Sequence, residues 1–247
     1  MDVIELVSRL DTLLEPWKFK DYCPNGLQVE GARRIERVVC GVTASQALLD
    51  EAVRLDADAV LVHHGYFWKG EPAAVTGIKR QRLATLLANN LHLLAYHLPL
   101  DAHPQFGNNA GLAQALGLQT QGTAGEQGLL AWGVPENSCN VGELALRTSG
   151  ALERLPLVIG SLERPVRRVA WCTGGGQGMF ADAIDMGVDV FITGEASEYC
   201  CHLARESGVA FLAAGHHATE RFGVQSLTRW LREQGLDARY VEIDNPI

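Results

Sequence analysis

The chain has 247 residues, of which 47% are hydrophobic and 20% are charged, and its formal net charge at pH 7 is −8. This length can bury a full hydrophobic core and suits one large domain or two small ones. The negative balance offers no general attraction to phosphate backbones, which argues against nucleic acid as a main partner. No stretch reaches the roughly 18 apolar residues of a membrane span. The N-terminal segment has the pattern of an amphipathic helix rather than of a signal peptide, so we predict a cytoplasmic protein.

The predicted elements alternate along the chain between short apolar strands and segments of helical periodicity. Strands are expected at residues 37–43, 58–64, 91–97, 168–174, 189–195, 209–215 and 238–244. Helices are expected at residues 45–55, 79–90, 108–116, 178–187, 196–207 and 222–234. This alternation is typical of β-α-β units and predicts an α/β protein with mainly parallel sheets.

One spacing occurs twice along the chain. Asp58 opens a predicted strand 21 residues after Arg37 opens the one before it, and Asp189 follows Arg168 at the same separation. Each pair encloses one helical segment, and a third strand follows in both halves. We favour an ancient duplication over a chance spacing as the explanation.

The duplication implies two domains rather than one. We expect two related three-layer α/β/α domains, at residues 1–125 and 126–247. The region 119–166 is rich in glycine and proline and has no clear periodicity, so the junction is expected within it. In this division the N-terminal domain carries the first three candidate site residues described below, and the C-terminal domain carries the last two.

The six cysteines are expected to be reduced thiols. No pair has C-x-x-C spacing, and a chain of this size needs no disulfide framework. The neighbours Cys200 and Cys201 would point about 100° apart on a helix, which favours packing over metal binding for them. The cysteines are Cys23, Cys40, Cys139, Cys172, Cys200 and Cys201.

Metal-binding side chains follow three of the predicted strands. Ligands of open α/β sheets bind beyond the carboxyl ends of the strands, where loops from different strands converge. Adjacent side chains leaving a strand point to opposite faces unless the backbone turns, and Gly65 is a candidate for that turn after the first strand end. The imidazoles and carboxylates at these ends are His63, His64, Asp101, His216 and Glu220.

These five side chains predict a site for two divalent metal ions. Neutral imidazole with carboxylate suits zinc, iron, manganese or nickel, and the absence of thiolates argues against a closed structural zinc site. Five ligands exceed what one ion commonly takes from a protein, whereas two ions about 3.5–4 Å apart would use them. A His–His pair by itself more often has no function, and here the convergence of three strand ends is what supports a metal site. This convergence does not include His92, His103 and His202, which suit packing or surface positions.

The glycine-rich segment at residues 172–179 allows two interpretations. Glycines between a strand and a helix can bind an anion, or they can simply permit a tight turn. The segment matches neither the dinucleotide nor the P-loop fingerprint. No G-x-S-x-G elbow is present either, so the sequence gives no support to serine hydrolysis.

Over nearly its whole length the chain resembles the Nif-three-like family, whose members are named GTP cyclohydrolase I type 2 homologues. The resemblance implies two α/β domains per subunit, a ring-shaped hexamer and dinuclear metal sites. It assigns the same five ligands and gives His217 a neighbouring role. The stretches that carry it are DYCPNGLQVEG (21–31), GVTASQALLDEAV (41–53), DAVLVHHGYFWKG (58–70), HLPLDAHPQFGNNA (97–110), VAWCTGGGQ (169–177), ITGEASE (192–198) and AAGHHATER (213–221).

The site residues lead us to expect metal-dependent hydrolysis, and the family resemblance implies a nucleotide or related heterocycle as the substrate. A metal ion can lower the pKa of a bound water towards neutrality and polarise the bond that is attacked. His97 and Glu195 are candidates for orienting ligands or for general acid–base catalysis, with structural roles as the alternative. The aromatic residues 66–68 suit stacking on a purine-like or pterin-like ring, or packing at a subunit contact. The alternative function is a non-enzymatic metal-binding ring scaffold for partner binding or metal handling.

Overall fold

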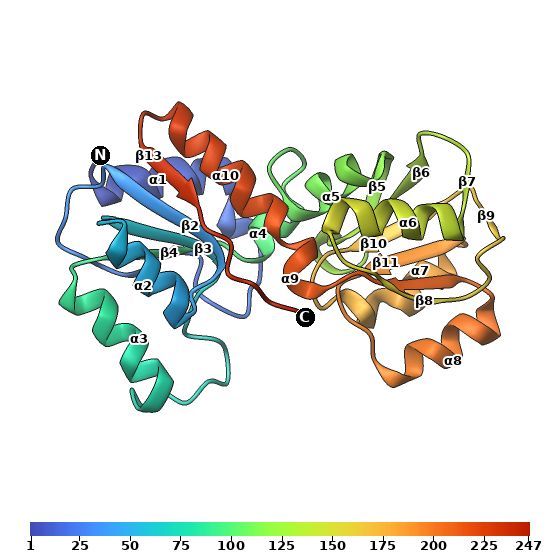
Figure 1. The fold of residues 1–247 in the computed structure, drawn as a ribbon, viewed down its shortest axis with the longest axis horizontal. Helices are drawn as coiled ribbons and strands as arrows, with labels where there is room; N and C mark the ends of the chain where they lie inside the picture. The colour runs from blue at the N-terminus through green and yellow to red at the C-terminus, as the bar shows by residue number, and fades with distance from the viewer. The chain divides into compact units, whose positions relative to one another are not determined.

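The computed structural model describes residues 1–247 and divides the chain into two compact units (Figure 1). The first unit comprises Met1–Leu100 and Gly223–Asp244, and the second comprises Asp101–Phe222 and Asn245–Ile247. These units differ from the expected ranges 1–125 and 126–247. The reason is strand pairing, because residues 118–124 join the second unit's sheet and residues 237–240 return to the sheet of the first.

The first unit is built on a five-stranded sheet of order β1-β4-β3-β2-β13. The four strands from β4 to β13 are parallel to one another, and β1 pairs with β4 in the antiparallel sense. The strands are β1 Gly26–Val29, β2 Arg37–Thr43, β3 Ala59–His64, β4 His92–Ala95 and β13 Asp237–Tyr240. The helices are α1 Val3–Leu14, η1 Pro16–Lys18, α2 Gln46–Arg54 and α3 Gly77–Ala88. α4 Leu98–Ala102 and α10 Arg221–Glu233 each have residues in both units, with most of α10 in the first.

Alternate residues of the same strands face two hydrophobic cores in the first unit. Val38 and Leu61 pack with α1 and α10 on one face of the sheet, whereas Val39 and Val60 pack with α2 and α3 on the other. The residues of a strand point alternately to its two faces, so a parallel strand covered by helices on both faces is apolar throughout. The result is the expected α/β/α layering (Figure 1).

The second unit has a six-stranded sheet of order β5-β6-β10-β11-β12-β8. The three central strands β10, β11 and β12 are parallel, and the outer pairings are antiparallel. The strands are β5 Leu118–Ala124, β6 Leu130–Pro135, β8 Leu157–Ile159, β10 Val169–Cys172, β11 Val190–Thr193 and β12 Ala210–Ala213, with β7 Cys139–Asn140 and β9 Pro165–Val166 forming a separate two-stranded ladder. The helices are α5 Asn108–Leu116, η2 Glu126–Gly128, α6 Val141–Leu152, η3 Gly176–Met179, α7 Phe180–Asp185, α8 Glu198–Ser207 and α9 His216–Thr219.

The core of the second unit also lies on both faces of its sheet. Trp171 and Ile192 pack with α5 and α6 on one face. On the other face Phe180 of α7 contacts Phe191 and Phe211, with ring centroids 5.6 and 4.9 Å apart. The α/β class is therefore confirmed in both units, although the second sheet is less parallel than expected. No helix combines the length and the apolar character that crossing a bilayer requires.

The repeated Asp spacing corresponds to the same local structure in both units. Asp58 Oδ2 accepts hydrogen bonds from the backbone N–H groups of Glu36 and Arg37, both at 2.9 Å. Asp189 Oδ2 accepts from those of Arg167 and Arg168, at 2.8 and 3.0 Å. Each carboxylate thus fastens the start of the preceding strand, as two copies of one ancestral unit would.

Acid sensitivity is expected from Asp189. Burial alone raises the pKa of this carboxyl, but hydrogen bonds from Arg167, Arg168 and Arg164 outweigh burial and lower it. Because the pKa of Asp189 is lower in the folded than in the unfolded state, ionised Asp189 stabilises the fold at pH values above the unfolded-state pKa of 3.8. This stabilisation is lost as the pH falls through the lower pKa of the folded state. We expect Asp189→Asn to cost about 1–3 kcal/mol of unfolding free energy at pH 7 and much less near pH 2. Urea unfolding of the wild type and the variant at pH 7 and at pH 2 measures this difference. Asp185→Asn, at an exposed position, serves as the control. An equal loss of unfolding free energy at both pH values would contradict the prediction.

Most predicted elements lie within a few residues of their expected bounds. The elements that were not predicted include β1 and α4 in the first hundred or so residues and, in the region 119–166, the β5–β6 pair, α6 and β8 in place of an irregular junction. β5 was missed because most of its side chains are polar and exposed at the edge of the sheet. The last strand, expected at 238–244, occupies only Asp237–Tyr240.

Candidate metal centre

Three histidines of the first unit converge at the carboxyl edge of its sheet. His63 and His64 end β3, and His97 follows β4, the parallel neighbour of β3. The His63 ring centroid lies 4.4 Å from that of His64 and 5.1 Å from that of His97. One ring nitrogen from each histidine lies within 4.8 Å of those of the other two. Because the strands are parallel neighbours, the fold itself produces this cluster.

Gly65, the residue directly after β3, lets the backbone pack closely against Gln28 and Ala95. A Cβ atom there would lie 2.2 Å from Gln28 Oε1 and 2.7 Å from Ala95 Cβ. Gln28 Oε1 accepts a hydrogen bond from the backbone N–H of Tyr66 at 2.7 Å. Glycine is therefore needed here because the neighbouring side chains leave no room for a Cβ atom. Its backbone conformation does not require glycine, because its φ is not positive.

Asp21 holds the third histidine of this cluster. The Nδ1–H of His97 donates to Asp21 Oδ1 at 2.7 Å, and the side chain of Asp21 is only 4% exposed. Burial raises the pKa of Asp21, but the hydrogen bond from His97 and its charge outweigh burial and lower that pKa to about 2. Burial and the charge of Asp21 raise the pKa of the nearby Cys23 thiol to about 12. Cys23 therefore remains a thiol beside an ionised carboxylate.

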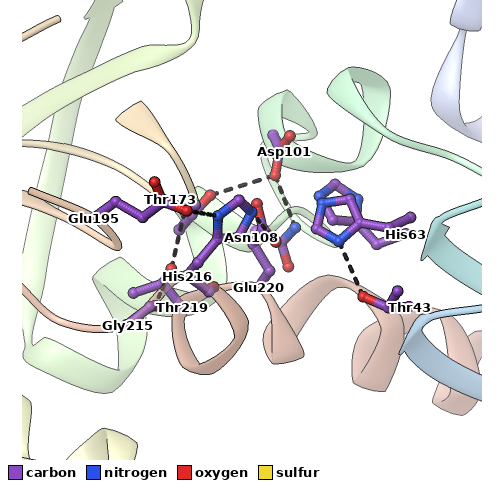
Figure 2. A network of polar contacts seen from close by, with 12 residues as sticks. Thr43, His63, Asp101, Asn108, Thr173, Glu195, Gly215, His216, Thr219 and Glu220 are labelled. Carbon is purple, nitrogen blue, oxygen red and sulfur yellow. Dashed lines mark hydrogen bonds and ion pairs between the residues drawn. The ribbon is translucent and has the colours of Figure 1, made fainter. Parts of the chain in front are cut away.

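In the second unit Asp101 belongs to a buried polar network (Figure 2). Asp101 Oδ1 accepts hydrogen bonds from Asn108 Nδ2 at 2.8 Å and from the Thr173 hydroxyl at 3.3 Å. Thr173 directly follows β10, and Asn108 begins α5. A carboxylate that is 7% exposed is thereby held in place from two elements.

His216 lies between two glutamates (Figure 2). Its Nδ1 is 2.6 Å from Glu195 Oε1, and its Nε2 is 3.1 Å from Glu220 Oε2. Burial lowers the pKa of His216, but Glu220 first and then Glu195, through hydrogen bonds and charge, outweigh burial and raise that pKa to about 9. The surroundings of this imidazole thus stabilise positive charge.

Asp101 and Glu220 also come together within the second unit. Their carboxylate oxygens lie within 4.8 Å of one another, and Glu220 is 3% exposed. Burial, together with the charges of these two carboxylates, raises the pKa of the Cys172 thiol. Three of the predicted ligands therefore form one acidic cluster, namely Asp101, His216 and Glu220. The cysteine beside this cluster, Cys172, stays a protonated thiol.

Gly174 makes room for this cluster, which gives the glycine-rich segment a structural role. Its φ is +66°, and a Cβ atom there would lie 2.0 Å from Glu220 Oε1 and 3.1 Å from His216 Nε2. The backbone N–H of Gly174 donates to Thr219 Oγ1 at 3.0 Å. The segment ends in a short 3₁₀ turn at Gly176–Met179, and the helix that follows it, Phe180–Asp185, is also short. The segment therefore serves close packing against the acidic cluster.

The remaining histidines have other contacts. His92 Nδ1 accepts from the backbone N–H of Gly31 at 3.0 Å, and its Nε2–H donates to Arg33 O at 2.8 Å, so both ring nitrogens hold backbone. His103 Nδ1 accepts from the N–H groups of residues 105 and 106. His202 is exposed on α8 and lies 2.9 Å from Glu198. His217 is buried, and its backbone N–H donates to Ile247 O at 2.9 Å.

The three aromatic residues after Gly65 differ in their surroundings. Tyr66 is 6% exposed and its hydroxyl donates to Ala44 O, so its ring belongs to the core. Phe67 has a φ of +64° and lies below Lys79 Nζ, 5.3 Å from the ring centroid. Trp68 is the one beside the cluster, with its ring centroid 5.0 Å from that of His97.

Several contacting residues were not assigned a role from sequence. They are Asp21 and Asn25 in the first unit and Asn108 and Thr173 in the second. All lie in stretches that carry the family resemblance, but their side chains are common in turns and helix starts. The resemblance was the signal for them, because periodicity says nothing about loop contacts. Gly174 was singled out as part of the glycine-rich segment, but its contact with Glu220 was not predicted.

Residues 1–246 match the family model of Duf34/NIF3, described as NGG1p interacting factor 3. The chain belongs to this family, as its sequence stretches predicted.

Curated relatives share about half of its residues. The chain is 54% identical over 245 residues to a protein of Yersinia pestis and 53% identical over 244 residues to one of Escherichia coli K12. The alignments cover 98% of this chain and 98% of each relative, and both relatives are named GTP cyclohydrolase 1 type 2 homolog.

Solved structures share the fold. A structure of protein YbgI, whose function its description calls unknown, superimposes with a TM-score of 0.97 at 52% identity. A protein of Thermus thermophilus does so with a TM-score of 0.90 at 35% identity, and both comparisons cover 100% of each chain.

Proposed function

We propose that the chain binds two divalent metal ions per subunit through His63, His64, Asp101, His216 and Glu220. Iron, zinc, manganese and nickel all suit this mixture of imidazole and carboxylate. Within each unit the ligand side chains are held by other residues, as in the contacts of His63 with Tyr96 O at 3.0 Å and of Asp101 with Asn108 at 2.8 Å. Such outer contacts are typical of metal ligands.

The observation that carries this proposal is His216 with a carboxylate at each ring nitrogen. Two glutamates within 2.6 and 3.1 Å of one imidazole form an environment that favours a cation. Without metal, a proton supplies part of that charge. A divalent ion bound by the Nε2 of His216 and by Glu220 would replace this proton, while Glu195 would continue to accept from Nδ1–H and orient the ring. Glu195 is therefore proposed as a positioning residue rather than a ligand.

We further propose that the protein is a hydrolase acting on a nucleotide or related heterocycle. When bound, divalent ions supply an activated water and polarise the bond to be cleaved. The residues of the chain hold the ions, and Trp68, beside His97, offers an aromatic surface for a ring. The names of the curated relatives point to the same substrate class. A homo-oligomer, with a hexamer as the expected form, and a cytoplasmic location are part of this proposal.

Elemental analysis and a nucleotide panel test the proposal together. Protein purified without chelator is expected to hold about two divalent ions per chain and to hydrolyse at least one purine or pterin nucleotide. Treatment with chelator should abolish turnover, and reloading with metal should restore it. Stoichiometric metal without turnover on any panel member, with any of the four metals, would contradict the hydrolase and favour the scaffold. Absence of bound metal would contradict both.

A further inference from the structure

The three histidines of the first unit share a feature beyond their proximity. An oxygen atom of the same unit contacts the Nδ1 of each ring: Tyr96 O with His63 at 3.0 Å, Thr43 Oγ1 with His64 at 3.2 Å, and Asp21 Oδ1 with His97 at 2.7 Å. A carbonyl and an ionised carboxylate can only accept, so the Nδ1 atoms of His63 and His97 carry the hydrogen. In the neutral rings the lone pair is then on Nε2. Metal-binding histidines characteristically donate their other N–H to a carboxylate or a carbonyl in this way.

His97 is fixed through its backbone as well as through its ring. Asp21 Oδ2 also accepts from the backbone N–H of Leu98 and from Asn25 Nδ2, both at 2.9 Å. Asn25 Oδ1 in turn accepts from the backbone N–H of His97 at 2.7 Å. The loop that carries Asp21 and Asn25 therefore fixes both the backbone and the ring of His97. Such a framework fits a side chain that must hold one orientation.

We propose that His97 is itself a metal ligand, and that His63, His64 and His97 form a three-imidazole site for a divalent ion with Asp21 as the positioning residue of His97. This inference rests on the proposed metal binding and adds a ligand to it. One ring nitrogen of each histidine lies within 4.8 Å of one from each of the other two. Two nitrogens on opposite sides of one ion, with bonds of about 2.0–2.1 Å, are about 4 Å apart. Three imidazoles are a known ligand set for catalytic zinc. A role for His97 in acid–base catalysis alone predicts no effect on metal affinity.

Cobalt binding to the full chain distinguishes these roles without any substrate. We expect His97→Gln to weaken Co²⁺ binding at least 10-fold in a chelator competition and to change the visible absorption of the bound Co²⁺. Asp21→Asn is expected to weaken binding about 10- to 100-fold, the range observed for partners of metal ligands. His202→Gln, the same substitution at an exposed position of α8, is expected to leave affinity and spectrum unchanged.

Co²⁺ affinity and absorption unchanged in a folded His97→Gln protein would overturn the inference while leaving the proposed function intact. A wild-type chain that binds no Co²⁺ would overturn both. A crystal of the wild-type protein grown with Co²⁺ gives a result that does not depend on how the variant folds. An anomalous peak within about 2.3 Å of His97 Nε2 is expected, and peaks bound only by other residues would refute the added ligand.

Discussion

Replacing Glu220 by glutamine is expected to weaken the binding of divalent metal at least 100-fold while leaving the fold intact. Glutamine keeps the size of the side chain but removes the negative charge, which is buried next to His216 Nε2 and near Asp101. Loss of a partner that only orients a ligand costs about 10- to 100-fold, so loss of a ligand should cost at least as much. Chelator competition with Zn²⁺ or Mn²⁺ measures the change.

Glu198→Gln is a suitable control for this variant. Glu198 is an exposed glutamate in the first turn of α8, and its side chain contacts His202 at 2.9 Å. Its replacement should leave metal affinity unchanged. Equal affinities of the wild type and Glu220→Gln would show that the acidic cluster of the second unit does not bind metal.

Gly174→Ala is expected to abolish stoichiometric metal binding without removing any ligand. The added methyl group would lie 2.0 Å from Glu220 Oε1 and 2.9 Å from its Cδ, so the buried carboxylate must move. Alanine at a φ of +66° also adds backbone strain, and together these effects should lower the free energy of unfolding by about 1–3 kcal/mol. Metal content and urea unfolding of the purified variant measure both consequences.

Gly178→Ala provides the matched control in the same glycine-rich segment. A Cβ atom at Gly178 meets nothing within 4 Å, and the φ of this residue is not positive. The substitution should therefore change neither metal content nor stability appreciably. If Gly174→Ala bound metal as well as Gly178→Ala does, the packing of Glu220 against Gly174 would have no part in metal binding.

The sequence was sufficient for the central strands and the residues that follow them. Apolar strands buried on both faces, such as Ala59–His64 and Val190–Thr193, have a composition that distinguishes them from helices. Parallel neighbours end at the same edge, so proximity of His63, His64 and His97 follows from the order of elements. An edge strand such as Leu118–Ala124 has mostly polar side chains, so the pattern of apolar residues does not indicate that a strand is present there.

Contacts that depend on loops were beyond the sequence for a different reason. Asp21 and His97 are 76 residues apart, and neither belongs to a periodic segment at the point of contact. Similarly, nothing in the spacing of Gly174 indicates that its missing side chain leaves space for Glu220, which lies 46 residues further on. Such contacts arise only once the sheets fix where the loops begin and end.

The paired aspartates at the beginning of β3 and β11 separate anchoring from the candidate site residues in both units. His64 follows Asp58 by six residues, and Glu195 follows Asp189 by six residues, so the two occupy corresponding places at opposite ends of their strands from the aspartates. The amino ends carry the same anchoring aspartate in both units, whereas the carboxyl ends carry an imidazole in one unit and a carboxylate in the other. Because the anchor and the candidate site residue lie at opposite ends of each strand, a substitution at the carboxyl end leaves the hydrogen bonds that fix the amino end in place.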